Sequence, residues 1–114
     1  KAFSDVIEDI EFAISQHNYR ITSKNNIGDA IAHRTEKPYP QSTILHFCSI
    51  QAAKKIYEIN PAYLLHMPCR ISVRETDKGT IIDARLIPEN DPAMHALALK
   101  VNQMMREIAD YAAE

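Results

Sequence analysis

The sequence holds few of the residues that build cofactor-binding loops or disulfide frameworks. Only two glycines occur among its 114 residues, so a glycine-rich loop that cradles a phosphate group cannot be built. Its two cysteines, Cys48 and Cys69, are too few for a disulfide-framework miniprotein. The sequence leaves open whether they are two thiols or one disulfide, and it leaves the redox compartment open as well.

Neither the charge nor the hydrophobic pattern is typical of a nucleic-acid or membrane protein. The 13 Lys and Arg residues are nearly balanced by 15 Asp and Glu, which gives a formal net charge of −2. The basic residues are scattered among acidic ones, so no stripe predicts contact with a phosphate backbone, and we expect no nucleic-acid partner. No apolar run approaches the ~20 residues that span a bilayer.

Length and composition predict a single soluble domain over residues 1–114. Apolar residues make up 46% and charged residues 25%, as in an ordinary globular protein. The chain is long enough to bury a core without the support of disulfide bonds or a bound metal. Because the chain begins at Lys1 and not at Met, we expect a processed, trimmed or partly ordered version of something longer, in which any signal peptide is no longer visible. A cytoplasmic location is favoured, with an exported form left open.

Helical periodicity and end signals mark four helices. Ser4 is a good N-cap for the first, and Asn18 suits the left-handed conformation that often closes a helix. Ser49 is a good N-cap for the third. The last helix has one broad apolar face that is wide enough to lie across a sheet. The predicted helices cover residues 4–16, 27–33, 50–59 and the segment after Pro92.

Strand signals lie between these helices. The segment 43–48 is apolar on both faces, as expected of a central strand. A hairpin is the clearest local signal, because 69–74 alternates apolar and polar residues before the turn Asp77-Lys78-Gly79. The remaining predicted strands are 19–23 and 80–86. This order of elements predicts an α+β fold, a curved antiparallel or mixed sheet covered by helices.

A run of features from Cys48 through Arg74 forms a recognisable pattern: Cys48, the helix Ile50 to Ile59, Asn60-Pro61, and the segment Leu64 to Val73 with its Pro68-Cys69 pair. In these residues the sequence resembles the family of the domain of unknown function 302 (DUF302). Weaker agreement covers the first and last helices. The resemblance implies a fold similar to that of the TATA-binding protein, strand, helix, several strands, helix, commonly found as a homodimer. It implies no established activity.

The sequence departs from the family pattern at three places. Asn18-Tyr19 stands where the family usually has Gly before the aromatic residue, and Asn can meet the same backbone demand. Ser49-Ile50 stands where the family usually has Pro shortly after the first cysteine. The family's first strand should precede Phe3, so we expect that strand to be largely missing.

One constellation is a candidate for chemistry: His46, Cys48, His66 and Cys69. Two thiolates and two imidazoles suit zinc or copper(I), and a thiol pair alone could exchange disulfides or carry sulfur, although the spacing matches no standard ligand pattern. Joint chemistry requires their strands to pair antiparallel, because parallel pairing would hold the cysteines about 17–20 Å apart. The competing interpretation, which we favour, is that both cysteines are small buried apolar residues.

Two functional hypotheses follow. The first is a non-enzymatic homodimer that binds a small molecule or a protein in a groove between the sheet and the last helix, with no cofactor. The second is a thiol-based redox, sulfur-handling, metal-binding or haem-binding protein that uses Cys48 and Cys69, with His46 and His66 as tuning or ligating groups. No residue pattern nominates a catalytic centre.

Overall fold

Four strands form a single sheet in the computed structural model, which describes all of residues 1–114. Each strand is antiparallel to the next, so the α+β class is confirmed and the sheet is antiparallel rather than mixed. In their order across the sheet the strands are β1 (Arg20–Asn26), β2 (Ser42–Cys48), β3 (Cys69–Thr76) and β4 (Gly79–Ala84). The prediction that the segment ending at Cys48 is a central strand is therefore confirmed.

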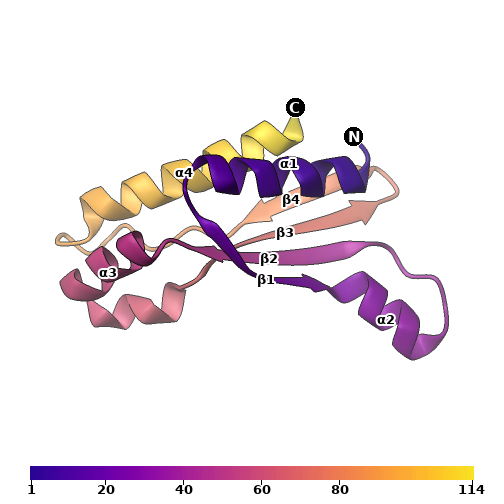
Figure 1. The fold of residues 1–114 in the computed structure, drawn as a ribbon, viewed down its shortest axis with the longest axis horizontal. Helices are drawn as coiled ribbons and strands as arrows, with labels where there is room; N and C mark the ends of the chain where they lie inside the picture. The colour runs from indigo at the N-terminus through magenta and orange to yellow at the C-terminus, as the bar shows by residue number, and fades with distance from the viewer.

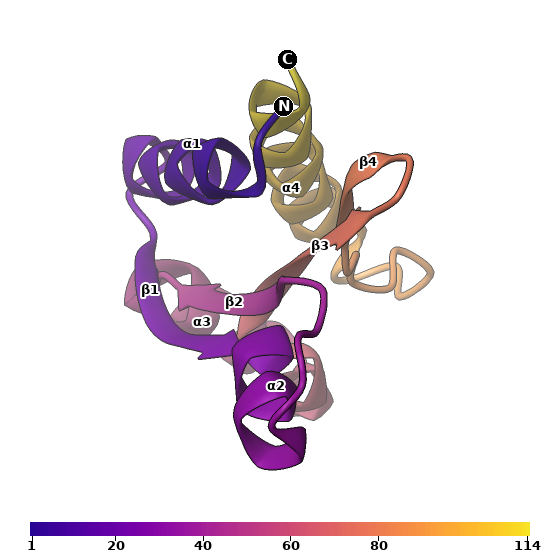
Figure 2. The same cartoon turned by 90° about the vertical axis from the view of Figure 1, so that its right-hand side faces the viewer.

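The helices are distributed unequally over the two faces of this sheet. Two of them, α1 and α4, lie side by side on one face, whereas α2 lies on the opposite side and α3 lies beyond one end (Figures 1 and 2). No helix covers the middle of the second face. The bounds are α1 (Phe3–Gln16), α2 (Ile27–Thr35), α3 (Ile50–Ile59), the 3₁₀ helix η1 (Pro61–His66) and α4 (His95–Ala113).

The core lies between the sheet and the α1–α4 pair. Along β2, Thr43, Leu45 and Phe47 are buried at every second position, as the alternation of side chains along a strand requires. Residues between them, such as Ile44, lie on the second face and are only half-buried. Burial of each large apolar side chain contributes roughly 1.5–3 kcal/mol, so this one-sided core holds the sheet to the helices.

The ends of the helices follow local signals with one exception. The Ser49 hydroxyl accepts a hydrogen bond of 3.3 Å from the Ala52 backbone N–H, which confirms it as the N-cap of α3. Asn18 has a φ of 62°, so the predicted left-handed residue after α1 is confirmed. The prediction of Ser4 as a cap is wrong, because α1 begins at Phe3 and places Ser4 inside its first turn.

The predicted hairpin is also confirmed. Strands β3 and β4 pair from Ile71 opposite Ala84 to the turn, where Gly79 has a φ of 123° that side chains with a Cβ rarely adopt. Two other features were not predicted. Strand β1 extends to Asn26, beyond the expected end at residue 23, and η1 follows α3 directly. The Asn60 side chain caps η1 by accepting from the backbone N–H of Ala62.

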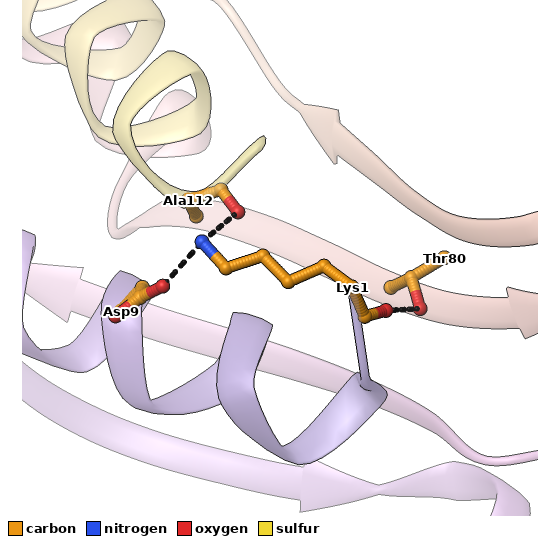
Figure 3. A network of polar contacts seen from close by, with 4 residues as sticks. All are labelled: Lys1, Asp9, Thr80 and Ala112. Atoms are coloured by element: carbon orange, nitrogen blue, oxygen red, sulfur yellow. Dashed lines mark hydrogen bonds and ion pairs between the residues drawn. The ribbon is translucent and has the colours of Figure 1, made fainter. Parts of the chain in front are cut away.

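The first residue connects three elements (Figure 3). The Lys1 ammonium donates to the backbone oxygen of Ala112, 3.0 Å away near the end of α4, and forms an ion pair with Asp9 of α1. Its backbone oxygen accepts from the Thr80 hydroxyl of β4 at 3.2 Å. A cation beside the carbonyls at a helix C-terminus is favourable. No strand precedes α1, and all four strands of the sheet follow it in the sequence.

Candidate functional site

The two cysteines meet at one end of the sheet because β2 and β3 are antiparallel. Phe47 is the register partner of Cys69, so Cys48, the next residue of β2, lies beside the start of β3. This is the strand direction that joint chemistry required. Both cysteines are half-buried and both are free thiols.

The two side chains leave the sheet in opposite directions. Cys69 shares the covered face with its partner Phe47 and packs against the hydrophobic core. Cys48 follows the alternate positions of β2, on the same side as Ile44 and His46. A disulfide requires Cβ atoms about 3.5–4.5 Å apart and directed toward one another, so this arrangement does not favour a bridge.

Burial raises the pKa of both thiols further above neutral pH. It raises the pKa of the Cys69 thiol from 9.0 to about 11, with a smaller contribution from the nearby Cys48. Burial also raises the pKa of Cys48. Tyr19, which packs edge-on against Phe47, has its pKa raised to about 12, mainly by burial and then by the two thiolates. A protonated thiol is a poor nucleophile and a poor metal ligand.

The two histidines of the candidate set, His46 and His66, lie in different parts of the fold. His46 lies on the uncovered face, where its Nδ1 is 2.9 Å from the Ser23 hydroxyl of β1. No carboxylate lies within bonding distance of this ring, so the pair lacks the third group that orients a catalytic base. His66 ends η1 and packs edge-on against Tyr63, with ring centroids 5.2 Å apart.

The four predicted residues therefore form no complete metal-ligand set. Nowhere in the chain do three or more His, Cys, Asp or Glu side chains gather in a way that could hold a metal ion. Of the candidate set, the structure brings together Cys48 and Cys69. It places His46 on the uncovered face.

A hollow lies on that same uncovered face, at β2, β3 and β4. Its volume is about 630 Å³. A hollow of about 280 Å³ lies between α4 and β4, where the sequence placed the binding groove, so the larger space is on the opposite face from the one expected. The lining residues of the larger hollow are Ile44, Arg70, Ser72, Asp83, Ala84, Arg85 and Leu86.

Strand register brings basic side chains into this hollow. Arg70 lies opposite His46 on one side, and on the other side its backbone oxygen accepts from the Arg85 N–H at 3.2 Å. The sequence showed only scattered basic residues, because Arg70 and Arg85 are fifteen positions apart. The usable signal was the hairpin itself, since alternation about its turn places Arg70, Ser72 and Arg85 on one face.

The sequence of the chain matches the model of one protein family. The sequence model described as "Domain of unknown function DUF302" matches residues 1–112. The chain belongs to the DUF302 family. The resemblance noted over the Cys48 to Arg74 segment is thereby confirmed over nearly the whole chain. A search of curated proteins finds no match.

A solved DUF302 structure has the same fold. The crystal structure of an uncharacterized conserved DUF302 protein from Bacillus stearothermophilus superposes with a TM-score of 0.85 at 18% sequence identity. The match covers 98% of this chain and 91% of that one. Neither comparison gives a DUF302 protein an activity. No helix of this chain has the length and apolar character needed to cross a membrane.

Proposed function

We propose that this DUF302 chain is a non-enzymatic binding domain that holds a small ligand on its uncovered sheet face and works as a homodimer. The observation that carries the proposal is the hollow of about 630 Å³ on that face. Its volume lies within the roughly 300–1,000 Å³ range of small-molecule sites. Apolar Ile44 and Leu86 line it together with polar side chains, the combination that binds and orients small ligands.

The ligand site is tested by filling it. Ser72 lies half-buried in the hollow and its side chain bonds to nothing else in the chain, so Ser72→Trp fills the space without touching the core. Ser4→Trp, at an exposed position of α1, is the matched control. A fragment screen by amide NMR should shift Ile44, Ser72 and Ala84 in the wild type and in the control, but not in Ser72→Trp. Shifts confined to other surfaces would refute the site.

The homodimer is supported by apolar exposure on α3 and η1. Ile50 and Leu65 are each 82% exposed, and exposed apolar patches commonly mark protein–protein interaction sites. A second copy of the same surface would cover them, because a two-fold interface places a patch against itself. The large apolar side chains exposed on the pair are Ile50, Tyr57, Ile59, Leu64 and Leu65.

Light scattering after size exclusion tests the dimer. We expect about 26 kDa for the wild type, twice the 13.0 kDa of one chain. Leu64→Asp/Leu65→Asp should elute as a folded monomer, whereas Leu99→Asp, at an exposed apolar site on α4, should stay dimeric. A monomeric wild type at high micromolar concentration would contradict the proposal.

The adjacency of Cys48 and Cys69 supports a second candidate function, a thiol-based redox, sulfur-handling, metal-binding or haem-binding protein. Both thiols lie at the junction of β2 and β3, within electrostatic reach of one another. Thiol titration with and without denaturant, combined with metal and haem analysis of the purified protein, tests it. Fast native reaction or bound metal would support it, and slow thiols without metal or haem would overturn it.

A further inference from the structure

Two arginines in the hollow have no partner within the chain. Arg70 of β3 and Arg85, which follows β4, occupy neighbouring positions across the two strands. Neither guanidinium forms a hydrogen bond or an ion pair with any other residue. Like charges on adjacent strands repel and cost stability, so the pair has no evident benefit to the fold alone.

The nearby carboxylate does not neutralise them. Asp83 lines the same hollow, but its Oδ2 is 3.4 Å from Nε of Arg74, with which it forms an exposed ion pair. The hollow therefore keeps an excess of positive charge although the chain as a whole has a net charge of −2. Ser72 lines the hollow together with Arg70 and Arg85.

From this charge pattern we propose that the hollow binds a small organic oxyanion, of the phosphate or carboxylate class. Resting on the proposed small-ligand function, this names the ligand's chemistry: Arg70 and Arg85 bind the anionic group and Ser72 donates a third hydrogen bond. The planar guanidinium matches both carboxylate and phosphate because it presents two parallel N–H donors. Ile44 and Leu86 contact the apolar remainder of the ligand.

The surroundings favour a small anion over a nucleic acid. Single-stranded nucleic acids bind proteins through aromatic side chains that stack on bases, in addition to basic groups. No aromatic residue lines this hollow. The positive charge is local to one hollow and is not a groove that could follow a backbone.

The test is a titration of the full chain, followed by NMR of the arginine Nε–Hε groups and backbone amides at constant ionic strength. The probes are methyl phosphate and acetate, with sodium chloride as the reference. We expect saturable shifts at Arg70, Ser72 and Arg85 with at least one oxyanion, and the stronger binder identifies the class. Arg70→Gln and Arg85→Gln should each weaken that binding about tenfold or more. Arg106→Gln, an exposed arginine on α4, should leave it unchanged.

Other outcomes separate the possible failures. Equal binding to the wild type and both Arg→Gln variants, which circular dichroism must show to be folded, would overturn the oxyanion proposal. If neutral cyclohexanol shifts Ile44 and Ser72 while neither oxyanion does, the anion class fails and the ligand site stands. If no probe shifts the hollow, both fail. Binding of a single-stranded oligonucleotide at these arginines, with no response to methyl phosphate or acetate, would favour a nucleic-acid partner instead.

Discussion

Asn102 shows how one polar side chain inside the core fixes a connection. Although it is 1% exposed, all of its amide atoms are bonded. Its Oδ1 accepts from the Ile87 N–H at 2.8 Å, and its Nδ2 donates to the Ile87 oxygen at 2.9 Å and to Glu89 at 2.7 Å. After β4 ends, the backbone groups of Ile87 have no neighbouring strand to bond to. The side chain of Asn102 on α4 bonds them instead. The connection from β4 to α4 is held in place as a result.

Asn102→Ala should lower the free energy of unfolding by about 2–3 kcal/mol, because both backbone groups of Ile87 would remain buried without partners. Urea denaturation monitored by circular dichroism measures this change. Asn90→Ala is the control, since Asn90 is exposed and should change stability by less than about 0.5 kcal/mol. Equal stability of the Asn102 variant and the wild type would show that this network contributes little.

The thiols give a prediction about pH. Because alkylation requires the thiolate and the pKa of Cys69 is about 11, its rate with iodoacetamide should still rise between pH 9 and pH 10.5. The unfolded chain, with an ordinary pKa of 9.0, should level off earlier. Peptide mass spectrometry reports each cysteine separately. A rate at Cys69 that levels off near pH 8 would contradict the effect of burial.

The raised pKa of Cys69 also affects the stability of the folded protein. A thiol whose pKa is raised in the folded state contributes stability that is fully present below the unfolded value of 9.0. That contribution is lost as the pH rises through about 11, because the unfolded chain then gains more from ionisation than the folded one. Ionisation of Cys69 should therefore make the protein progressively less stable between pH 9 and pH 11, whereas its contribution should not change with pH near pH 7.

At the scale of elements, α2 depends on a glycine for its position. A Cβ at Gly28 would overlap the backbone oxygen of Pro40 and lie 2.9 Å from the backbone nitrogen of Ser42. The first turn of α2 thus lies directly against the segment that enters β2. Only a residue without a side chain permits this approach.

Gly28→Ala should destabilise the protein by about 1–3 kcal/mol, although alanine is the better helix former by about 1 kcal/mol. The cost arises because the atoms that must move belong to the backbone of Pro40 and Ser42. Thermal denaturation checks this, with Ala30→Gly on the exposed side of α2 as a measure of helix propensity alone. A higher melting temperature for Gly28→Ala would contradict the close packing.

The sequence predicted most elements because their signals are local. Apolar periodicity, the Ser49 cap and the turn at Gly79 each act within a few residues. The end of β1 was not predicted, since Lys24, Asn25 and Asn26 are weak strand formers that β2 holds by pairing. η1 was missed although Asn60-Pro61 is a suitable start for a short helix.

The candidate site was less predictable because it depends on register. The sequence could place His46 and Cys48 on one side of a strand, and the antiparallel pairing brings Cys48 to Cys69 as required. The sequence could not show that α1 and α4 would both pack on the same face of the sheet. That choice leaves Arg70 and Arg85 together in an uncovered hollow.

At the scale of the whole molecule, one side chain connects both ends of the described chain. Lys1 contacts α1 through Asp9 and α4 through the Ala112 oxygen, and its side chain is 28% exposed. Water screens such a pair only partly. The contact therefore links the two helices that cover the sheet.

Lys1→Met should reduce stability by about 0.5–1 kcal/mol, and most of that difference should disappear in 1 M salt. Lys54→Met is the control, because the Lys54–Glu58 pair is far more exposed, at 71% and 61%, and should contribute almost nothing. Chemical denaturation at both salt concentrations distinguishes the two. A salt-independent loss would assign the effect to packing of the lysine stem.

The nearness of the two ends of the described chain also means that the order of the elements along the backbone could be changed without changing the fold (Figures 1 and 2). Because the two ends lie near one another in both views, a short linker would close the backbone into a ring. New ends could then be opened in the exposed Thr35 to Gln41 connection, at the opposite end of β2 from Cys48. A permuted chain of this kind would keep the fold's geometry while reversing which half is synthesised first.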